Sequence, residues 1–92
     1  MDIALVSLNK HGDIIGKKIE ASIPIDVFSK SKIENFNIVK ISQKLMKVYE
    51  AIIFVCSTGI AVRAISPFIK NKCEDSAVIV VDIMGKYVIS LL

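Results

Sequence analysis

The chain has 92 residues, which is enough for one small domain or for part of a larger protein. Its hydrophobic content of 53% and mean hydropathy of +0.60 exceed what so small a domain easily buries. We therefore expect homo-oligomerisation, or docking with further domains, to cover the surplus. The net charge of +3, scattered lysines and absent tryptophan argue against nucleic-acid binding. No uncharged run reaches the roughly 18 residues of a membrane span.

The compartment and the redox state follow from the N-terminal residues and the two cysteines. The first residues lack the basic stretch and the cleavage site of a secretory signal, so we expect a cytoplasmic protein. Cys56 lies in an apolar run and Cys73 in a polar one, and their spacing matches neither a redox pair nor a zinc site. We expect two reduced thiols and no bound metal.

The first half of the chain predicts two strands separated by a helix. The expected order is a buried strand at 3–8, a turn at 9–12, a helix at 13–22, a more exposed strand at 24–29 and a loop at 30–37. On the helix, Ile14, Ile15 and Ile19 fall on one side, and the charged residues fall elsewhere. Gly16 is expected to weaken this helix.

The second half predicts a helix, three strands and two short helices. The expected order is a helix at 38–50, a buried strand at 51–57, a short helix after Gly59, another from Pro67 to about Lys70, and strands at 77–83 and 87–92. In the first helix, Ile41, Leu45 and Val48 have helical spacing. The Met84-Gly85-Lys86 link predicts a hairpin between the last two strands.

These elements predict an α/β fold. Strands alternating with helices, and continuous apolar runs in the central strands, favour a three-layer sandwich with a mainly parallel sheet. The hairpin adds an antiparallel C-terminal strand. We expect residues 1–92 to form a single domain. Because the sequence stops within a strand, we also expect it to be the N-terminal domain of a longer protein.

Ser57, Thr58 and Gly59 follow the apolar strand and are the main candidates for ligand binding. Open parallel sheets bind ligands beyond the carboxyl ends of their strands. Gly59 allows a tight turn, and the amides that begin the next helix favour an anion. Arg63, the only arginine, lies one turn later on the face of Gly59, and its planar fork suits a carboxylate or phosphate. The alternative is that Thr58-Gly59 only makes the turn and that Arg63 is a solvated or structural cation.

Other polar residues are weaker candidates. His11 lies in the loop after the first strand, at the same sheet edge, but a lone loop histidine is more often a bystander than an acid–base group. Asp82 fits a hairpin turn, and Glu74-Asp75 fits a solvated loop. No phosphate-binding glycine motif and no nucleophile–base pair is present. The residues themselves indicate an anion-binding domain whose catalytic residues are unknown.

An ordered series of motifs runs from Ile53 to Leu92. An apolar strand is followed by Thr-Gly-Ile-x-Val-Arg-x-Ile-x-Pro, then by Ala-Val-x-Val-x-Asp, Gly-Lys and Ile-Ser-Leu-Leu. This series resembles the N-terminal region of the CbiG-type cobalt-precorrin-5A hydrolases of anaerobic cobalamin biosynthesis. The opening strand and loop, "DIALVSLNKHG", are similar to those of the same family.

The resemblance implies an enzyme that opens the δ-lactone of cobalt-precorrin-5A with loss of acetaldehyde. Its corrinoid substrate carries the cobalt, so the resemblance implies no cofactor held by the protein. Ser57, Thr58, Gly59 and Arg63 would dock the acetate and propionate groups of the macrocycle. In the family, this region runs into a Ser-Gly-His segment and further domains, so we do not expect these 92 residues to catalyse the reaction alone. The alternatives are a non-enzymatic dimerisation or anion-binding module and a nucleotide or phosphate binder.

Overall fold

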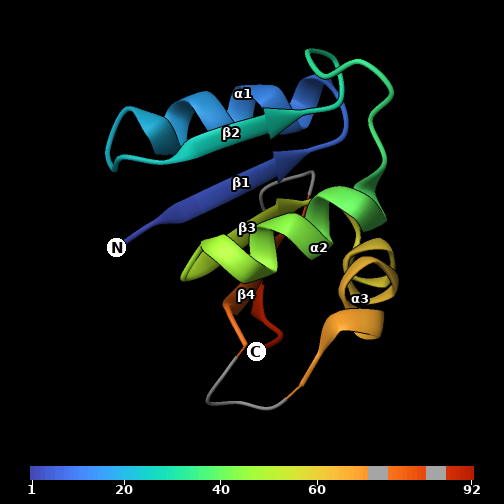
Figure 1. Cartoon of the computed structure of the whole chain (residues 1–92). Coiled ribbons are helices and arrows are strands. Elements are labelled where there is room, and N and C mark those ends of the chain that lie inside the picture. The colour runs from blue at the N-terminus through green and yellow to red at the C-terminus, as the bar shows by residue number, and fades with distance from the viewer. Residues whose placement is uncertain (71–74, 83–86) are drawn as a thin grey trace.

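The computed structural model describes residues 1–70, 75–82 and 87–92. Figure 1 shows strands and helices alternating along the chain. The elements are β1 (Ile3–Ser7), α1 (Lys10–Glu20), β2 (Asp26–Ser29), α2 (Ile38–Val48), β3 (Ala51–Val55), α3 (Thr58–Ile65), a 3-10 helix (Ser66–Phe68), β4 (Ala77–Val81) and β5 (Val88–Ser90). Within these ranges no helix has the length and apolar character needed to cross a bilayer.

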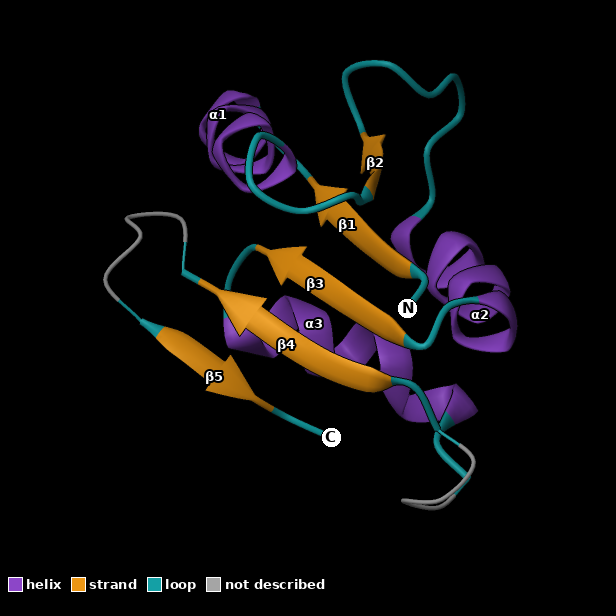
Figure 2. Ribbon diagram, turned by 90° about the vertical axis from the view of Figure 1, so that its left-hand side faces the viewer, coloured by secondary structure: helices purple, strands orange, loops and turns teal. Residues whose placement is uncertain are grey.

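The strands form one sheet in the order β2-β1-β3-β4-β5. Its first four strands are parallel, and β5 pairs antiparallel with β4. Figure 2 shows α1 on one side of the sheet and α2 and α3 on the other. The predicted three-layer α/β sandwich with an antiparallel last strand is therefore confirmed. The predicted link through Met84-Gly85-Lys86 lies outside the described residues, as do Cys73 and Glu74.

Alternating side chains of the central strands divide the core between the two faces of the sheet. Ile52 and Phe54, both fully buried, pack in one cluster with Leu45 of α2 and Ile65 of α3. The intervening residues of β3 point the other way. There Ile53 and Val55 join Leu5, with Ile15 and Ile19 of α1 packed against them. Two-sided burial explains why β3 is a continuous apolar run.

The predicted turn at 9–12 is wrong, because α1 already begins at Lys10. The Asn9 side chain accepts a hydrogen bond of 2.9 Å from the Gly12 amide, which satisfies one of the free donors at the start of the helix. Ile14, which the spacing placed on the same side as Ile15 and Ile19, is 51% exposed. Gly16 brings α1 close to the sheet, since a Cβ there would lie 3.1 Å from a methyl carbon of Leu5.

The prediction for α2 is confirmed except at its end. Asn37 caps the helix through a 3.1 Å hydrogen bond from the Lys40 amide, and Leu45 is buried. Val48 is 67% exposed, because the helix ends there and Tyr49 turns into an extended conformation. The predicted helix at 38–50 therefore extends beyond the observed end at Val48, and Val48 does not join the buried apolar side of the helix.

Candidate functional site

The carboxyl ends of β1 and β3 lie side by side, at the point in the sheet where the order of successive strands changes direction. The chain leaves β1 toward β2 on one side and leaves β3 toward β4 on the other. In sheets of this order the crevice beyond such a switch point is where ligands bind. The loop after β1 leads into α1, and the loop after β3 leads into α3 on the opposite face. Two helix N-termini therefore flank this edge of the sheet.

Ser57 caps the start of α3. Its backbone is extended, and its hydroxyl oxygen accepts a 3.4 Å hydrogen bond from the Ile60 amide. The first hydrogen bond of the helix runs from the Ala61 amide to the Ser57 carbonyl oxygen, at 3.2 Å. Because the amides of Thr58 and Gly59 come before it, they have no acceptor inside the helix. The predicted tight turn at Gly59 is wrong: Gly59 is already the second residue of α3, and the chain changes direction before it.

Arg63 and Gly59 lie on the same side of α3, as predicted. A Cβ added to Gly59 would be 3.7 Å from a guanidinium nitrogen of Arg63. The exposed side chain of Arg63 thus reaches back along the helix toward its N-terminus, the direction that helical side chains generally take. The structure brings Ser57, Thr58, Gly59 and Arg63 together, and their role in binding stays a prediction. A cation in the last turn of a helix is also favourable for the helix dipole.

A cluster that the sequence reasoning missed surrounds Asp13, in the first turn of α1. One carboxylate oxygen accepts hydrogen bonds from the Ser7 and Ser29 hydroxyls, at 2.7 and 2.6 Å. The other accepts one from the Ser31 hydroxyl at 3.0 Å. The hydrogen bonds from Ser29 and Ser7 hold the pKa of Asp13 below its ordinary value of 3.8. Asp13 is therefore ionised at neutral pH and is a weak general base.

The Asp13 cluster ties together the ends of β1 and β2 and the start of α1. Ser7 and Ser29 are almost fully buried, so their hydroxyls need these partners. Gly12 makes the approach possible, because a Cβ there would lie 2.5 Å from the Ser7 hydroxyl oxygen. Recognising Asn9 as a helix cap would have placed Asp13 in the first turn. His11, in the same first turn of α1, is exposed.

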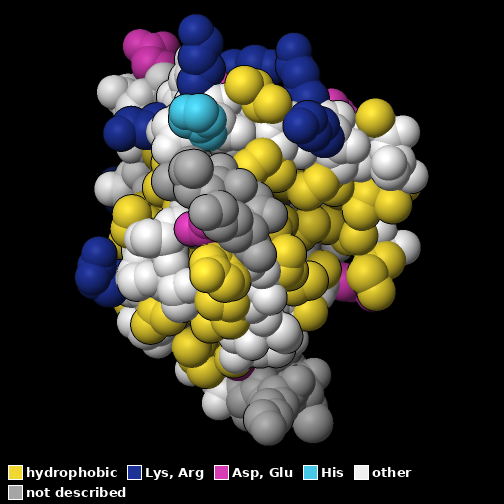
Figure 3. Space-filling view, turned by 180° about the vertical axis from the view of Figure 1, so that it is seen from behind, with side chains coloured by type: hydrophobic (Ala, Val, Ile, Leu, Met, Phe, Trp, Pro, Cys, Tyr) yellow, Lys and Arg dark blue, Asp and Glu magenta, His cyan; other side chains and the backbone are white. Residues whose placement is uncertain are grey.

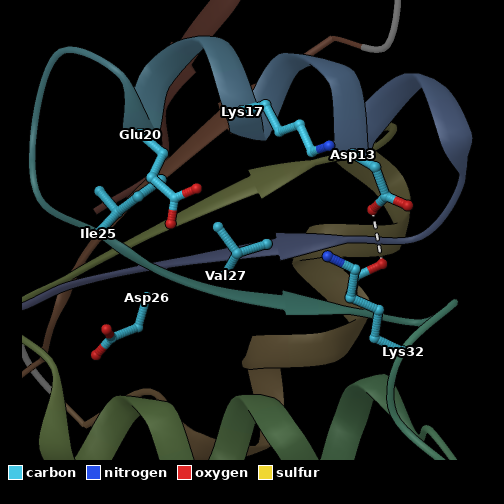
Figure 4. Close-up of a pocket in the computed structure, with 8 residues that line it drawn as sticks. Asp13, Lys17, Glu20, Ile25, Asp26, Val27 and Lys32 are labelled. Atoms are coloured by element: carbon cyan, nitrogen blue, oxygen red, sulfur yellow. Dashed lines mark hydrogen bonds between the residues drawn. The ribbon is translucent and has the colours of Figure 1, made fainter.

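A hollow of about 350 Å³ lies between α1 and the edge strand β2 (Figure 4). Its lining consists of Asp13, Lys17, Glu20, Ile25, Asp26, Val27, Ser29 and Lys32. Three of these residues are acidic and two are basic. This excess of carboxylates disfavours an anion, so the hollow does not compete with the start of α3 as a site for a carboxylate ligand.

Neither metal binding nor thiol chemistry is supported within the ranges that the structure describes. They contain no group of three or more acidic, histidine or cysteine side chains that could hold an ion. Cys56 is a free, buried cysteine whose thiol lies 3.3 Å from the Ser57 carbonyl oxygen. Burial raises its pKa to about 11, so it is a protonated thiol at neutral pH.

Comparison with known proteins gives consistent matches. The family described as "Cobalamin synthesis G N-terminal" matches residues 40–92. Two proteins named cobalt-precorrin-5A hydrolase are similar: one from Salmonella typhimurium is 34% identical over 98% of this chain, and one from Priestia megaterium is 32% identical over 99% of it. The chain spans 28% of the length of each.

A solved structure supports the same grouping. The crystal structure of a cobalamin biosynthesis protein G homologue from Sulfolobus solfataricus matches with a TM-score of 0.74 and 29% identity. The match covers 99% of this chain and 29% of the other. The family match includes more than half of the chain, from within α2 through α3 to β5. The chain belongs to the cobalamin synthesis G N-terminal family.

Proposed function

We propose that this chain is the N-terminal domain of a cobalt-precorrin-5A hydrolase, which opens the δ-lactone of its corrinoid substrate. The observation that carries the proposal is that two hydrolases of this name match 98% and 99% of the chain. The cobalt arrives with the substrate, so the domain needs no cofactor of its own, and the reaction takes place in the cytoplasm.

The domain's part in the reaction is to dock the carboxylate groups of the macrocycle. The free amides of Thr58 and Gly59 and the partial positive charge of the helix start attract an anion. Arg63 adds a forked cation that reaches the same place and can hold a carboxylate with two hydrogen bonds. Lactone opening also needs a base to activate water, and we assign none to this domain.

The test replaces the matching N-terminal stretch of the Salmonella typhimurium hydrolase with this chain and measures lactone opening. Hydrogen bonds to charged groups contribute about 1.5–3 kcal/mol, so Arg63→Ala should lower kcat/KM roughly ten- to a hundredfold. Arg63→Lys should fall between Arg63→Ala and the parent chimera, because it keeps the charge and loses the fork. Lys47→Ala, which removes an exposed cation from α2, is the matched control and should leave turnover unchanged.

The melting temperature separates the two readings of Arg63. Docking predicts that Arg63→Ala melts like the parent, since the side chain is exposed. A lower melting temperature with normal turnover would identify Arg63 as a structural cation of α3. A parent chimera without any lactone opening would contradict the proposed function itself.

A further inference from the structure

One face of the sheet is only half covered. Five strands about 4.8 Å apart span roughly 19 Å, and a helix with its side chains is only about 10 Å wide. Each face therefore needs two helices. One face has α2 and α3, whereas α1 is the only described helix on the other, where it lies beside β1 and β2 (Figure 2). Within the described part of the chain, no helix covers β4 and β5 on the side of α1.

Apolar side chains make up most of the uncovered half, with Ser90 of β5, the register partner of Ile79, as its polar member. Ile79 and Val81 continue the face of Ile53 and Val55, because these residues are register partners in parallel strands. Val88 pairs with Val81 and so points the same way. We call Ile79, Val81 and Val88 the β4–β5 apolar face. In Figure 3, hydrophobic side chains gather on this side of the molecule, below the basic side chains at its upper end.

Exposure along this face rises with distance from α1. Ile53 is 9% exposed, Ile79 and Val81 are partly buried, and Val88 is 70% exposed. Ile14, on α1 itself, is 51% exposed. Parallel sheets are normally covered on both faces, and a contiguous exposed apolar patch marks an interaction site. The β4–β5 apolar face is therefore shaped for a helix that lies beside α1.

The related hydrolases have the polypeptide to supply this helix. The chain spans 28% of each hydrolase and 29% of the homologue of known structure. We propose that an amphipathic helix from the part of the hydrolase outside these 92 residues packs on the β4–β5 apolar face. A second copy fits less well, because the helix it could offer to the gap, α1, has Lys17 and Lys18 exposed on its surface. This inference rests on the proposed role as one domain of a longer hydrolase.

Thiol labelling at two matched positions tests the inference. Val88→Cys places a probe on the β4–β5 apolar face, and Val48→Cys places one on α2; the native side chains are 70% and 67% exposed. Cys73 is replaced by serine in both variants, and the buried Cys56 reacts slowly because its pKa is raised to about 11. Both probes should react at similar rates in the 92-residue protein. In the chimera with the rest of the Salmonella typhimurium hydrolase, Val88→Cys should react at least about tenfold more slowly, and Val48→Cys at an unchanged rate.

Equal rates for Val88→Cys in the 92-residue protein and in the chimera would overturn the proposal. Protection of Val88→Cys in the 92-residue protein that increases with protein concentration would also overturn it, because a second copy would then cover the face. Circular dichroism of each variant checks that the domain is folded. Labelling requires no turnover, so a chimera that protects Val88→Cys and does not open the lactone would refute the proposed function and leave the docking surface intact.

Discussion

Replacement of Asp13 by alanine should strongly destabilise the domain. The carboxylate accepts hydrogen bonds from Ser7, Ser29 and Ser31, and the first two side chains are 0% and 2% exposed. Hydrogen bonds to a charged group contribute about 1.5–3 kcal/mol each when they are buried. Ser7 keeps a second acceptor, the Asn9 carbonyl at 3.1 Å, which limits the loss. We therefore expect Asp13→Ala to lower the free energy of unfolding by about 2–4 kcal/mol.

Thermal and urea unfolding measure this change, with Glu34→Ala as the control for loss of an exposed acid. For a domain of this size the melting temperature should fall by roughly 10–20 °C. A double-mutant cycle with Ser29→Ala should show a coupling of about 1–2 kcal/mol, because the two side chains share a hydrogen bond. A loss below about 0.5 kcal/mol, the usual effect of a surface change, would refute the reasoning.

The pH dependence gives a second check on Asp13. Its pKa is lower in the folded protein than the ordinary 3.8, mainly through the Ser29 and Ser7 hydroxyls, so the unfolded chain binds the proton more tightly. The stabilisation is thus fully present above about pH 5 and is lost as the pH falls through 3.8 and below. The difference between the parent and Asp13→Ala should shrink over that range. A constant difference down to the acid limit would show that the carboxylate charge is not what stabilises the cluster.

Two further predictions concern glycine positions and Tyr49. Gly12→Ala should lower stability by about 1–3 kcal/mol, because its Cβ would collide with the Ser7 hydroxyl; Gly59→Ala, whose Cβ meets only Arg63 at 3.7 Å, should be neutral or stabilising in the same melts. The Tyr49 hydroxyl donates a 2.6 Å hydrogen bond to Asp26, which raises the pKa of Tyr49 to about 12. The stabilisation that this hydrogen bond provides is present below pH 10 and is lost toward pH 12. Tyr49→Phe should therefore be less stable than the parent at neutral pH and should lose less stability on titration into that range. Equal alkaline stability profiles for the two proteins would contradict this.

The order of the elements and their layers follow from hydrophobic patterning, because burial on both faces needs long apolar runs. The strand β3 was predictable for this reason, whereas the antiparallel partner of β4 was predicted from the short link between the last two strands. The ends of the helices were not, since they depend on single polar contacts. Asn9 begins α1 three residues before the predicted start, and the end of α2 leaves Val48 in solvent.

The candidate site was predictable only where one segment contains all its parts. Ser57, Thr58, Gly59 and Arg63 lie within seven consecutive positions, so helical spacing already places them together. The Asp13 cluster combines Ser7 of β1, Asp13 of α1 and Ser29 of β2. These residues meet only because the ends of β1 and β2 are in register, with Ser7 opposite Ser29. Sequence patterns contain no sign of that register.

The three described glycines differ in what they do for the fold, and the difference bears on Gly59. Gly12 and Gly16 are buried, and a Cβ at either would press on β1, so packing explains both. Gly59 is exposed in the first turn of α3 and has a helical backbone, and a Cβ there would make only an ordinary contact with Arg63 at 3.7 Å. Glycine inside a helix is about 1 kcal/mol less favourable than alanine, and nothing in the packing of α3 requires it. Glycine here leaves the surface beside Arg63, at the start of the helix, without a side chain from position 59. The absence of a side chain there therefore favours close approach of a ligand, as the docking of a carboxylate requires.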